Sequence, residues 1–181
     1  IYIKQEIDNI NEFSKLIALR GSNRGYKSDQ VEPEKLMAVL EAARIAPTAH
    51  NNQPFRIIVI HTEGRANELR PIYGRPWFVQ APIVIGIVGV PNEGWVRQDG
   101  KNYYEVDVAI AMDHLILAAH NLGLGTCWVG DFDPEAARDI IRLPEDVVPL
   151  AFYPLVYTGK EPREKIRRPL NELVKYEKWA D

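Results

Sequence analysis

Apolar positions along the chain alternate between helical spacing and short β-branched runs. Helical spacing covers residues 8–19, 33–46, 63–73, 103–122, 134–142 and, in the tail, 170–179. Apolar runs that predict strands cover residues 55–61, 82–90, 125–130 and 147–158. The run 82–90 is apolar on both faces, which predicts a central strand. The pattern therefore predicts an α+β fold around one sheet.

Prolines and glycines mark the ends of the predicted helices. Pro33 opens the second helix, Pro47 follows its end, and Gly123 terminates the long helix 103–122. No interior linker rich in glycine, serine or proline divides the chain, so we expect one domain over residues 1–181. The long apolar helix covers more surface than a small sheet needs, and a dimer that shares it would explain the excess.

Composition excludes several classes of protein. The net charge of −3 gives no global field for nucleic acid or an anionic membrane, and no apolar run reaches the roughly 20 residues of a membrane span. Cys127 is the only cysteine and the four histidines lack zinc-ligand spacing, so we expect no disulfide framework and no metal site. We expect a cytoplasmic protein.

The stretch Arg20-Gly21-Ser22-Asn23-Arg24 places two arginines around a hydroxyl group. A guanidinium offers a fork of donors that fits phosphate oxygens, and the serine adds a further donor. The alternative is that both arginines are cations at a helix C-terminus, where they interact with the helix dipole. The pentapeptide alone favours the helix-end interpretation.

The segment 47–54, PTAHNNQP, is a polar turn bounded by prolines between a helix and a strand. Loops at strand ends are common ligand sites in such sheets. An asparagine side chain presents a donor and an acceptor together, which suits the edge of a planar heterocycle. The alternative is a turn whose side chains bond to its own backbone, and the sequence favours neither.

Two later segments have both a functional and a structural interpretation. Glycines bracket the strand predicted at 125–130, which would let a flat ligand approach the backbone, whereas a helix C-cap followed by an ordinary strand is the alternative. Cys127 lies within this strand, and we expect a buried, inert thiol. The basic run Lys165–Arg168 indicates a solvated loop unless it meets Arg20 and Arg24 in space.

Taken in order, four segments resemble the nitroreductase family of flavin-dependent oxidoreductases. They are RGSNRGY, EAARIAPTAHNNQPFRIIVI, DVAIAMDHLILAAHNLGLGTCWVG and KEPREKIRRPLNELV, and they extend from about residue 16 to residue 176. The resemblance implies an α/β sandwich in which helices flank a central, mostly antiparallel sheet. It also implies a homodimer that binds FMN non-covalently at its interface, with the tail from about residue 160 completing the phosphate site and the dimer.

The resemblance implies cofactor-binding residues by their match to the family's motifs. The phosphate side comprises Arg20, the Gly21 backbone, Ser22, Lys165 and Arg167, with Arg168 as the alternative if the register shifts by one. The ring side comprises Arg24, Asn51 with Asn52 and Gln53 nearby, and the backbone of Val129 and Gly130. The partner subunit is expected to contribute Pro47, Thr48, Ala49 and His50.

The sequence departs from the family pattern at two places. Val129 stands where some members carry an acidic residue, which removes a charge near the flavin. The loop 91–102 is short and leaves little room for the helical excursion that shapes substrate pockets elsewhere in the family. Trp95, Tyr103 and Tyr104 are candidates for an aromatic wall over the flavin, with core or dimer packing as the alternative.

The implied activity is that of an FMN-dependent NAD(P)H oxidoreductase. Electrons would pass from NADH or NADPH through flavin N5 to nitroaromatics, quinones or similar small acceptors by a ping-pong mechanism. No catalytic side chain is expected because the cofactor carries the redox chemistry, although Arg24 would stabilise the reduced flavin. The alternatives are an FMN-binding sensor or carrier, a specialised flavin enzyme such as a reductive dehalogenase, and an FMN-free binder of phosphate ligands.

Overall fold

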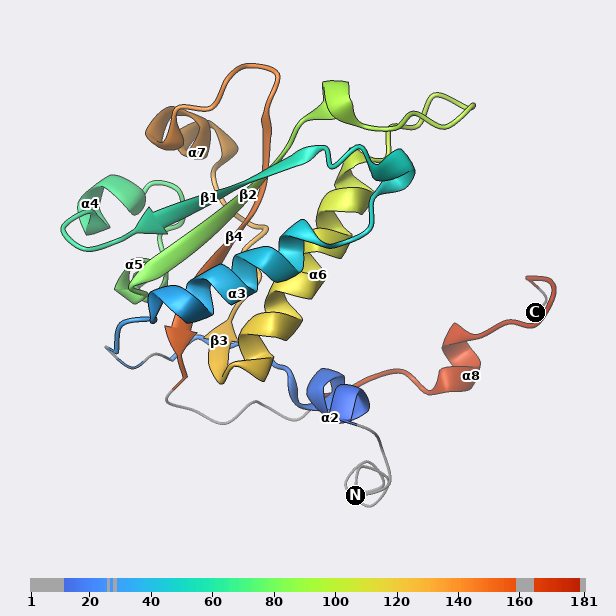
Figure 1. Cartoon of the computed structure of the whole chain (residues 1–181), viewed down its shortest axis with the longest axis horizontal. Coiled ribbons are helices and arrows are strands. Elements are labelled where there is room, and N and C mark those ends of the chain that lie inside the picture. Colours follow the sequence, from blue (N-terminus) through green and yellow to red (C-terminus); the bar gives the residue numbers. More distant parts are fainter. Residues whose placement is uncertain (1–11, 26, 28, 159–164, 180–181) are drawn as a thin grey trace.

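The computed structural model describes residues 12–25, 27, 29–158 and 165–179. One antiparallel sheet has the order β1-β2-β4-β3 and comprises β1 (Phe55–His61), β2 (Ile83–Gly89), β3 (Leu124–Thr126) and β4 (Val148–Tyr157). The helices are α2 (Glu12–Leu19), α3 (Pro33–Arg44), α4 (Ala66–Leu69), α5 (Pro76–Gln80), α6 (Tyr104–Asn121), α7 (Pro134–Ile141) and α8 (Leu170–Leu173) (Figure 1). The predicted α+β class with an antiparallel central sheet is confirmed.

Helices cover both faces of the sheet because its strands are apolar on both faces. In β2, Ile83, Ile85 and Ile87 pack with α3 and α6, whereas Val84 packs on the opposite side with Phe152 and the helices α4, α5 and α7. This two-residue alternation follows from the strand geometry, which sends successive side chains to opposite faces. Every residue of β2 is buried, so the predicted central strand is confirmed.

The helix α6 runs along one face of the sheet and leads from the loop after β2 to the start of β3 (Figure 1). It packs against α3 on one side and against β2 and β3 on the other. Its buried side chains are Asp107, Val108, Ala111, Met112, Leu115, Ile116 and Ala119. The helix ends before Gly123, whose φ of 76° is the left-handed conformation that glycine adopts readily at a helix C-terminus.

The strand predicted at 125–130 is shorter than the sequence indicates. Only Leu124–Thr126 pairs with β4 as a regular strand, and the chain touches β4 again at an isolated bridge between Val129 and Phe152. Between these points Trp128 turns outward, 46% exposed, and packs edge-on against Tyr153. The apolar pattern alone could not show this departure from the ladder.

Two helical predictions need correction, and one helix was missed. The helix predicted over 63–73 is reduced to α4, because Pro71 has no N–H group to continue the helix. The short helix α5, which begins at Pro76 and buries Phe78, was not predicted. In the tail, α8 stops after four residues and Val174 is extended, so the helix predicted to reach residue 179 is wrong.

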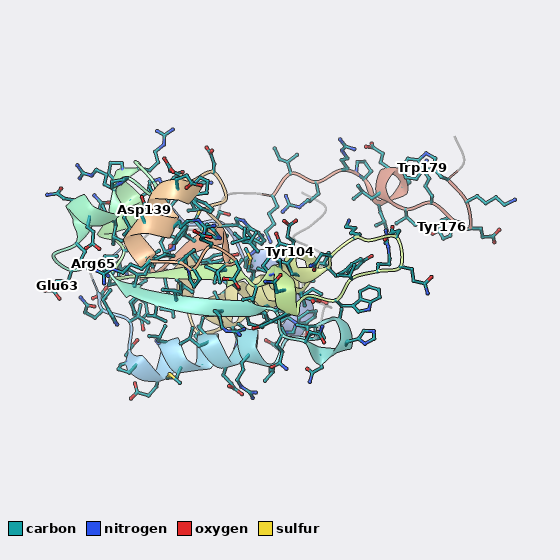
Figure 2. All side chains as sticks on the ribbon, turned by 90° about the horizontal axis from the view of Figure 1, so that it is seen from above. Glu63, Arg65, Tyr104, Asp139, Tyr176 and Trp179 are labelled. Carbon is teal, nitrogen blue, oxygen red and sulfur yellow. The ribbon has the colours of Figure 1, made fainter. Side chains whose placement is uncertain are left out.

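Residues 165–179 form an arm that leaves the body of the protein. Figure 2 shows Tyr176 and Trp179 on this arm, well away from the body, and the two side chains are 86% and 88% exposed. The arm makes few contacts with the rest of the described chain apart from its beginning at Lys165.

Candidate functional site

The segment Arg20–Arg24 lies between the end of α2 and the edge strand β3. The Arg20 backbone N–H donates to the Leu16 carbonyl at 3.0 Å, which closes the last turn of α2. Two residues later, Ser22 forms a parallel bridge with Thr126, and the Asn23 N–H donates to the Thr126 carbonyl at 2.8 Å. The edge of β3 therefore holds the backbone of this segment in place.

Asn23 anchors the segment, and the sequence did not identify it. Its side chain is only 7% exposed, its Oδ1 accepts from the Thr158 hydroxyl at 3.1 Å, and its Nδ2 donates to the Gly21 carbonyl at 3.3 Å. A Cβ added at Gly125 would lie 3.0 Å from Asn23 Nδ2, so the glycine provides the space for this side chain. The one available signal was a polar residue between two charged ones beside a glycine-rich strand.

Basic residues from both ends of the described chain gather at the C-terminal end of α2. Lys165 Nζ donates to the Ile17 carbonyl at 2.7 Å. Burial lowers the pKa of Lys165, and the neighbouring charges of Arg20 and Arg167 lower it further. The pKa of His120, at the end of α6, is lowered by burial and then by Lys165 and Arg20. The structure thus brings Arg20 together with Lys165 and Arg167, a proximity that the sequence left open.

This basic cluster has no acidic counterpart within the described ranges 12–25, 27, 29–158 and 165–179. The salt bridges of that part of the chain lie elsewhere, for example between Arg56 and Glu93, and none includes Arg20, Arg24, Lys165 or Arg167. Like charges held together without a counter-charge repel one another. The arrangement is therefore suited to receive an anion.

Arg24 lies near Trp77 of α5 and near Cys127, which follows β3. Its guanidinium carbon is 5.9 Å from the ring centroid of Trp77, a cation–π distance. Burial raises the pKa of the Cys127 thiol, and the charge of Arg24 and contacts with Ser22 and Arg24 partly oppose that rise. Cys127 is 2% exposed, so the prediction of a buried thiol is confirmed.

The segment 48–53 forms a second polar element, at the other end of α6. Its backbone has positive φ values at His50 (53°), Asn51 (56°) and Gln53 (52°), a conformation that non-glycine residues adopt at a cost. Gln53 donates from its N–H to Thr48 Oγ1 at 3.1 Å and from Nε2 to the Asn51 carbonyl at 2.9 Å. The alternative of a turn that bonds to itself is therefore present in the structure, with a strained backbone.

Aromatic side chains cover this loop. The His50 and Trp95 rings are stacked with centroids 5.5 Å apart and an interplanar angle of 14°, and the Trp95 and Tyr103 rings meet edge to face at 5.1 Å. Tyr104 lies apart from them and packs on β2, where a Cβ at Gly89 would fall 2.4 Å from its ring. Of the three predicted aromatic residues, only Trp95 and Tyr103 form a cluster.

The predicted site residues lie in two groups within one chain (Figure 1). Ala49 contacts Asp107 in the first turn of α6, whereas His120 and the basic cluster lie at its last turn. At about 1.5 Å of rise per residue, these two turns are about 20 Å apart along the helix axis. A single chain therefore does not bring Asn51 and Arg20 to one site.

The backbone beyond β3 offers one of the two amides assigned from sequence. The Val129 N–H donates to the Phe152 carbonyl at 2.9 Å, and the Val129 carbonyl accepts from the Phe152 N–H at 3.0 Å. Both backbone groups of Val129 are therefore engaged within the sheet. Gly130 follows outside the ladder and is exposed, so its amide can face a ligand.

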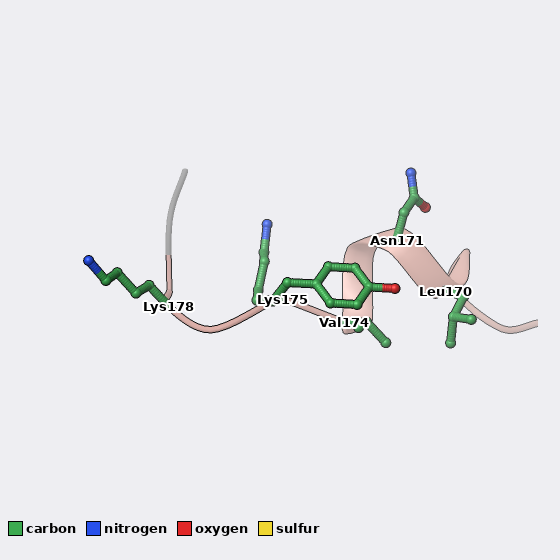
Figure 3. A pocket seen from close by; sticks show the side chains of 6 residues that line it. Leu170, Asn171, Val174, Lys175 and Lys178 are labelled. Carbon is green, nitrogen blue, oxygen red and sulfur yellow. The ribbon is translucent and has the colours of Figure 1, made fainter.

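Other features of the described chain do not add to this site. Figure 3 shows a pocket on the arm, lined by Leu170, Asn171, Val174, Lys175, Tyr176 and Lys178, away from the basic cluster. Across the residues that the structure describes, no group of histidine, cysteine and carboxylate side chains could hold a metal ion. Within the same residues, no helix has both the length and the apolar character needed to cross a membrane.

Comparisons with known proteins identify a matching family and similar folds. A model of the Nitroreductase family matches residues 17–77 and 68–157. The structure is similar to the crystal structure of a nitroreductase family protein from Clostridium difficile, with a TM-score of 0.84 and 38% identity over 93% of this chain and 99% of that one.

Two curated relatives extend the similarity. The FMN reductase (NAD(P)H) of Bacillus subtilis is 26% identical over 175 residues, which cover 85% of this chain and 70% of that protein. The NADH dehydrogenase of Thermus thermophilus is 28% identical over 186 residues, which cover 86% of this chain and 91% of that protein. With the family match over residues 17–157 and the shared fold, the chain belongs to the nitroreductase family.

Proposed function

We propose that this protein is an FMN-dependent NAD(P)H oxidoreductase that reduces small organic acceptors. The observation that carries the proposal is the gathering of Arg20, whose segment also carries Ser22, with Lys165 and Arg167, without a salt bridge to an acidic residue of the described chain. The similarity to an FMN reductase that uses NAD(P)H supports the choice of cofactor.

The donor set fits the phosphate group of FMN. A phosphate monoester carries close to two negative charges at neutral pH and accepts hydrogen bonds at three oxygens. A guanidinium fork, an ammonium group and a hydroxyl supply complementary donors. Burial and then the charges of Arg20 and Arg167 lower the pKa of Lys165, and phosphate binding would relieve the repulsion between these charges. On this basis Arg20, Ser22, Lys165 and Arg167 form the phosphate side of the site.

The ring side would use groups nearer the sheet. Arg24 lies over the ring of Trp77 of α5, and its charge would stabilise negative charge on a reduced ring. The Gly130 N–H is the available backbone donor, because the Val129 groups are bonded to Phe152. FMN, when bound, supplies hydride and electron transfer between NAD(P)H and an acceptor, which gives ping-pong kinetics.

A homodimer would complete the site. Asn51 and Arg20 lie at opposite ends of α6, so a second copy must supply one of them if both contact one cofactor. The surface that such a copy would cover is present: α2 buries none of its residues, and Phe13, Ile17 and Leu19 are 59%, 45% and 54% exposed. An isolated helix of this length is not stable in water.

The arm offers further apolar surface for the same partner. Ile166, Leu170 and Leu173 are 90%, 74% and 60% exposed, in addition to the exposed aromatic residues near its end. Patches of this kind mark interaction surfaces. We infer that the arm packs on the second copy, so that the tail completes both the phosphate site and the dimer.

The proposed location is the cytoplasm. The chain has a single cysteine, Cys127, and so needs no oxidising compartment for an internal disulfide.

The acceptors that we propose are nitroaromatics, quinones and similar flat molecules. His50, Trp95 and Tyr103 form a ring cluster beside Asn51, and such a surface favours stacking of planar compounds. In the dimer this cluster would face the ring side of the partner's site.

An anaerobic titration tests the proposed function. The purified chain is loaded with FMN, gel filtration measures its size, and NADH or NADPH is added without oxygen. We expect a dimer with a yellow flavin spectrum that bleaches on addition of the donor and recovers on addition of menadione or nitrofurazone. Bound flavin that stays oxidised would instead indicate a binding protein, and a chain that cannot be loaded with FMN would refute the cofactor.

A further inference from the structure

The strained loop 48–53 needs a contact that holds it in place. His50, Asn51 and Gln53 all have left-handed φ values. Such conformations persist only where the surrounding structure enforces them, and they are frequent at ligand sites. The question is which contact enforces them here.

Most side-chain bonds of this loop are exposed to water. Gln53 bonds to Thr48 and to Asn51, and Asn52 Nδ2 donates to the Glu93 carbonyl at 3.0 Å, all at exposed positions. Water competes for donors and acceptors of this kind, so each bond contributes little to the rigidity of the loop. These contacts alone do not explain the strained backbone.

Asp107 provides the sheltered contact. Its Oδ1 accepts from the Ala49 backbone N–H at 2.9 Å, and the residue is 2% exposed. The bond joins positions 58 residues apart in the sequence, so it serves the loop and not the capping of α6. A hydrogen bond to a buried carboxylate is stronger than one between neutral groups, because charge and the low local dielectric both strengthen it.

The surroundings of the second oxygen of Asp107 indicate that packing alone does not account for a carboxylate at this position. Oδ2 is buried and has no hydrogen-bond partner among the described residues. Burying a carboxylate with one unpartnered oxygen is unfavourable, and an apolar residue would fill the same space without that cost. The location in the first turn of α6 reduces the cost, since the helix dipole favours negative charge there.

We propose that Asp107 is the positioning residue of the loop 48–53, and that through Ala49 it places Asn51 and His50 for the flavin ring and the acceptor. The assignment of these two targets rests on the proposed function. The mechanical part, the hold of Asp107 on the loop, does not depend on it.

Two substitutions at Asp107 separate the hydrogen bond from the rest of the side chain. Asp107→Ala removes the acceptor, and Asp107→Asn keeps an amide oxygen that can accept from the Ala49 N–H. Asp113→Asn, an exposed aspartate on the same helix, is the matched control. Hydrogen–deuterium exchange of a peptide covering 48–54 reports the loop directly, and the β2 peptide 83–89 reports global opening.

For Asp107→Ala we expect about tenfold faster exchange of the loop peptide, with little change in the β2 peptide. We also expect about tenfold weaker FMN binding and a higher KM for the acceptor, with a nearly unchanged kcat. Asp107→Asn should recover part of each effect, because its amide oxygen can still accept from Ala49, and the control should resemble the wild type. Unchanged loop exchange in Asp107→Ala, or an Asn variant as impaired as the Ala variant, would overturn the proposal.

A variant on the donor side keeps the test valid if Asp107→Ala fails to fold. Ala49→Pro removes the backbone N–H that donates to Asp107 Oδ1. Position 49 is the first of the 3-10 turn Ala49–Asn51, where proline is tolerated. The preceding Thr48 has a ψ of 156°, which suits a residue before proline. We expect the same faster exchange of the loop, and unchanged exchange would again contradict the proposal. Because exchange is measured without cofactor, failure of the wild type to bind FMN would refute the proposed function alone.

Discussion

Lys165 Nζ donates a hydrogen bond to the Ile17 carbonyl, 2.7 Å away, and so fixes the start of the arm beside Arg20. The bond joins residues 148 positions apart in the sequence. It also places an ammonium group next to two guanidinium groups, although like charges repel. This relationship brings two basic segments together, and we propose that together they bind the phosphate group of FMN.

Loss of Lys165 or Arg20 should weaken FMN binding. In Lys165→Ala and in Arg20→Ala we expect the FMN dissociation constant to rise by about tenfold or more, the effect of removing one charge-assisted hydrogen bond. Fluorescence quenching of FMN measures the constant. Lys175→Ala, which removes an exposed lysine further along the arm, is the control and should bind FMN normally. Unaltered binding in both site variants would mean that the phosphate lies elsewhere.

The imidazole of His120 should report the charge of the same cluster. Its pKa lies below the ordinary value of 6.5 because of burial and then because of Lys165 and Arg20. Lys165→Ala should therefore raise the pKa of His120, and binding of phosphate should raise it in the wild type. Titration of the imidazole resonances by NMR checks both shifts, with Lys175→Ala as the control.

The sign of the linked effect on stability follows from the same shift. With a pKa below 6.5 in the folded state, His120 binds fewer protons when folded than when unfolded as the pH falls below 6.5. His120 therefore lowers the free energy of unfolding on acidification, and His120→Gln should lessen that loss. A His120 pKa at or above 6.5 in the free protein would contradict the described surroundings.

The parts of the fold that depend on local pattern were predictable. β2 is buried on both faces and its sequence is apolar on both faces, while α3 begins at Pro33 as the proline indicates. The length of β3 was not predictable, because pairing with β4 stops where Trp128 turns outward, and no local signal sets that point.

The candidate site divides in the same way. Arginines and a serine in Arg20–Arg24 indicate an anion site by their chemistry, but the meeting of Arg20 with Lys165 depends on the packing of both ends of the chain. Asn23 and Asp107 went unnoticed because their roles come from burial, and a polar residue in a sequence carries no mark of its burial. Tyr104 was grouped with Trp95 by proximity in sequence, yet α6 directs it toward β2.

The anchor of the Arg20–Arg24 segment should be sensitive to crowding at Gly125. Gly125→Ala would place a Cβ 3.0 Å from Asn23 Nδ2 and 3.1 Å from its Cβ, so Asn23, which accepts from the Thr158 hydroxyl, must shift by a few tenths of an ångström. We expect both Gly125→Ala and Asn23→Ala to lower the free energy of unfolding by about 1–3 kcal/mol. Both should also weaken FMN binding, because the segment that carries Arg20 loses its anchor.

Denaturant unfolding and FMN titration of the same preparations check these effects. Gly74→Ala is the matched control, since nothing lies within 4 Å of a Cβ at that position. The double variant should be less impaired than the sum of the single changes, because both act on the same contact. Strict additivity would show that Gly125 and Asn23 act independently.

The aromatic residues near the N-terminal end of α6 should separate into two functional classes. Trp95 stacks on His50 and meets Tyr103, so Trp95→Ala should raise the KM for a quinone acceptor by roughly 3–10-fold, the loss of one aromatic contact. Tyr104 packs against Gly89, and its ring is only partly buried. Tyr104→Ala should therefore lower the free energy of unfolding by about 1–3 kcal/mol, less than a fully buried aromatic residue, at a nearly unchanged acceptor KM. Steady-state kinetics and denaturant unfolding on both variants distinguish the classes, and a Tyr104 variant with normal stability and a raised acceptor KM would restore Tyr104 to the aromatic wall.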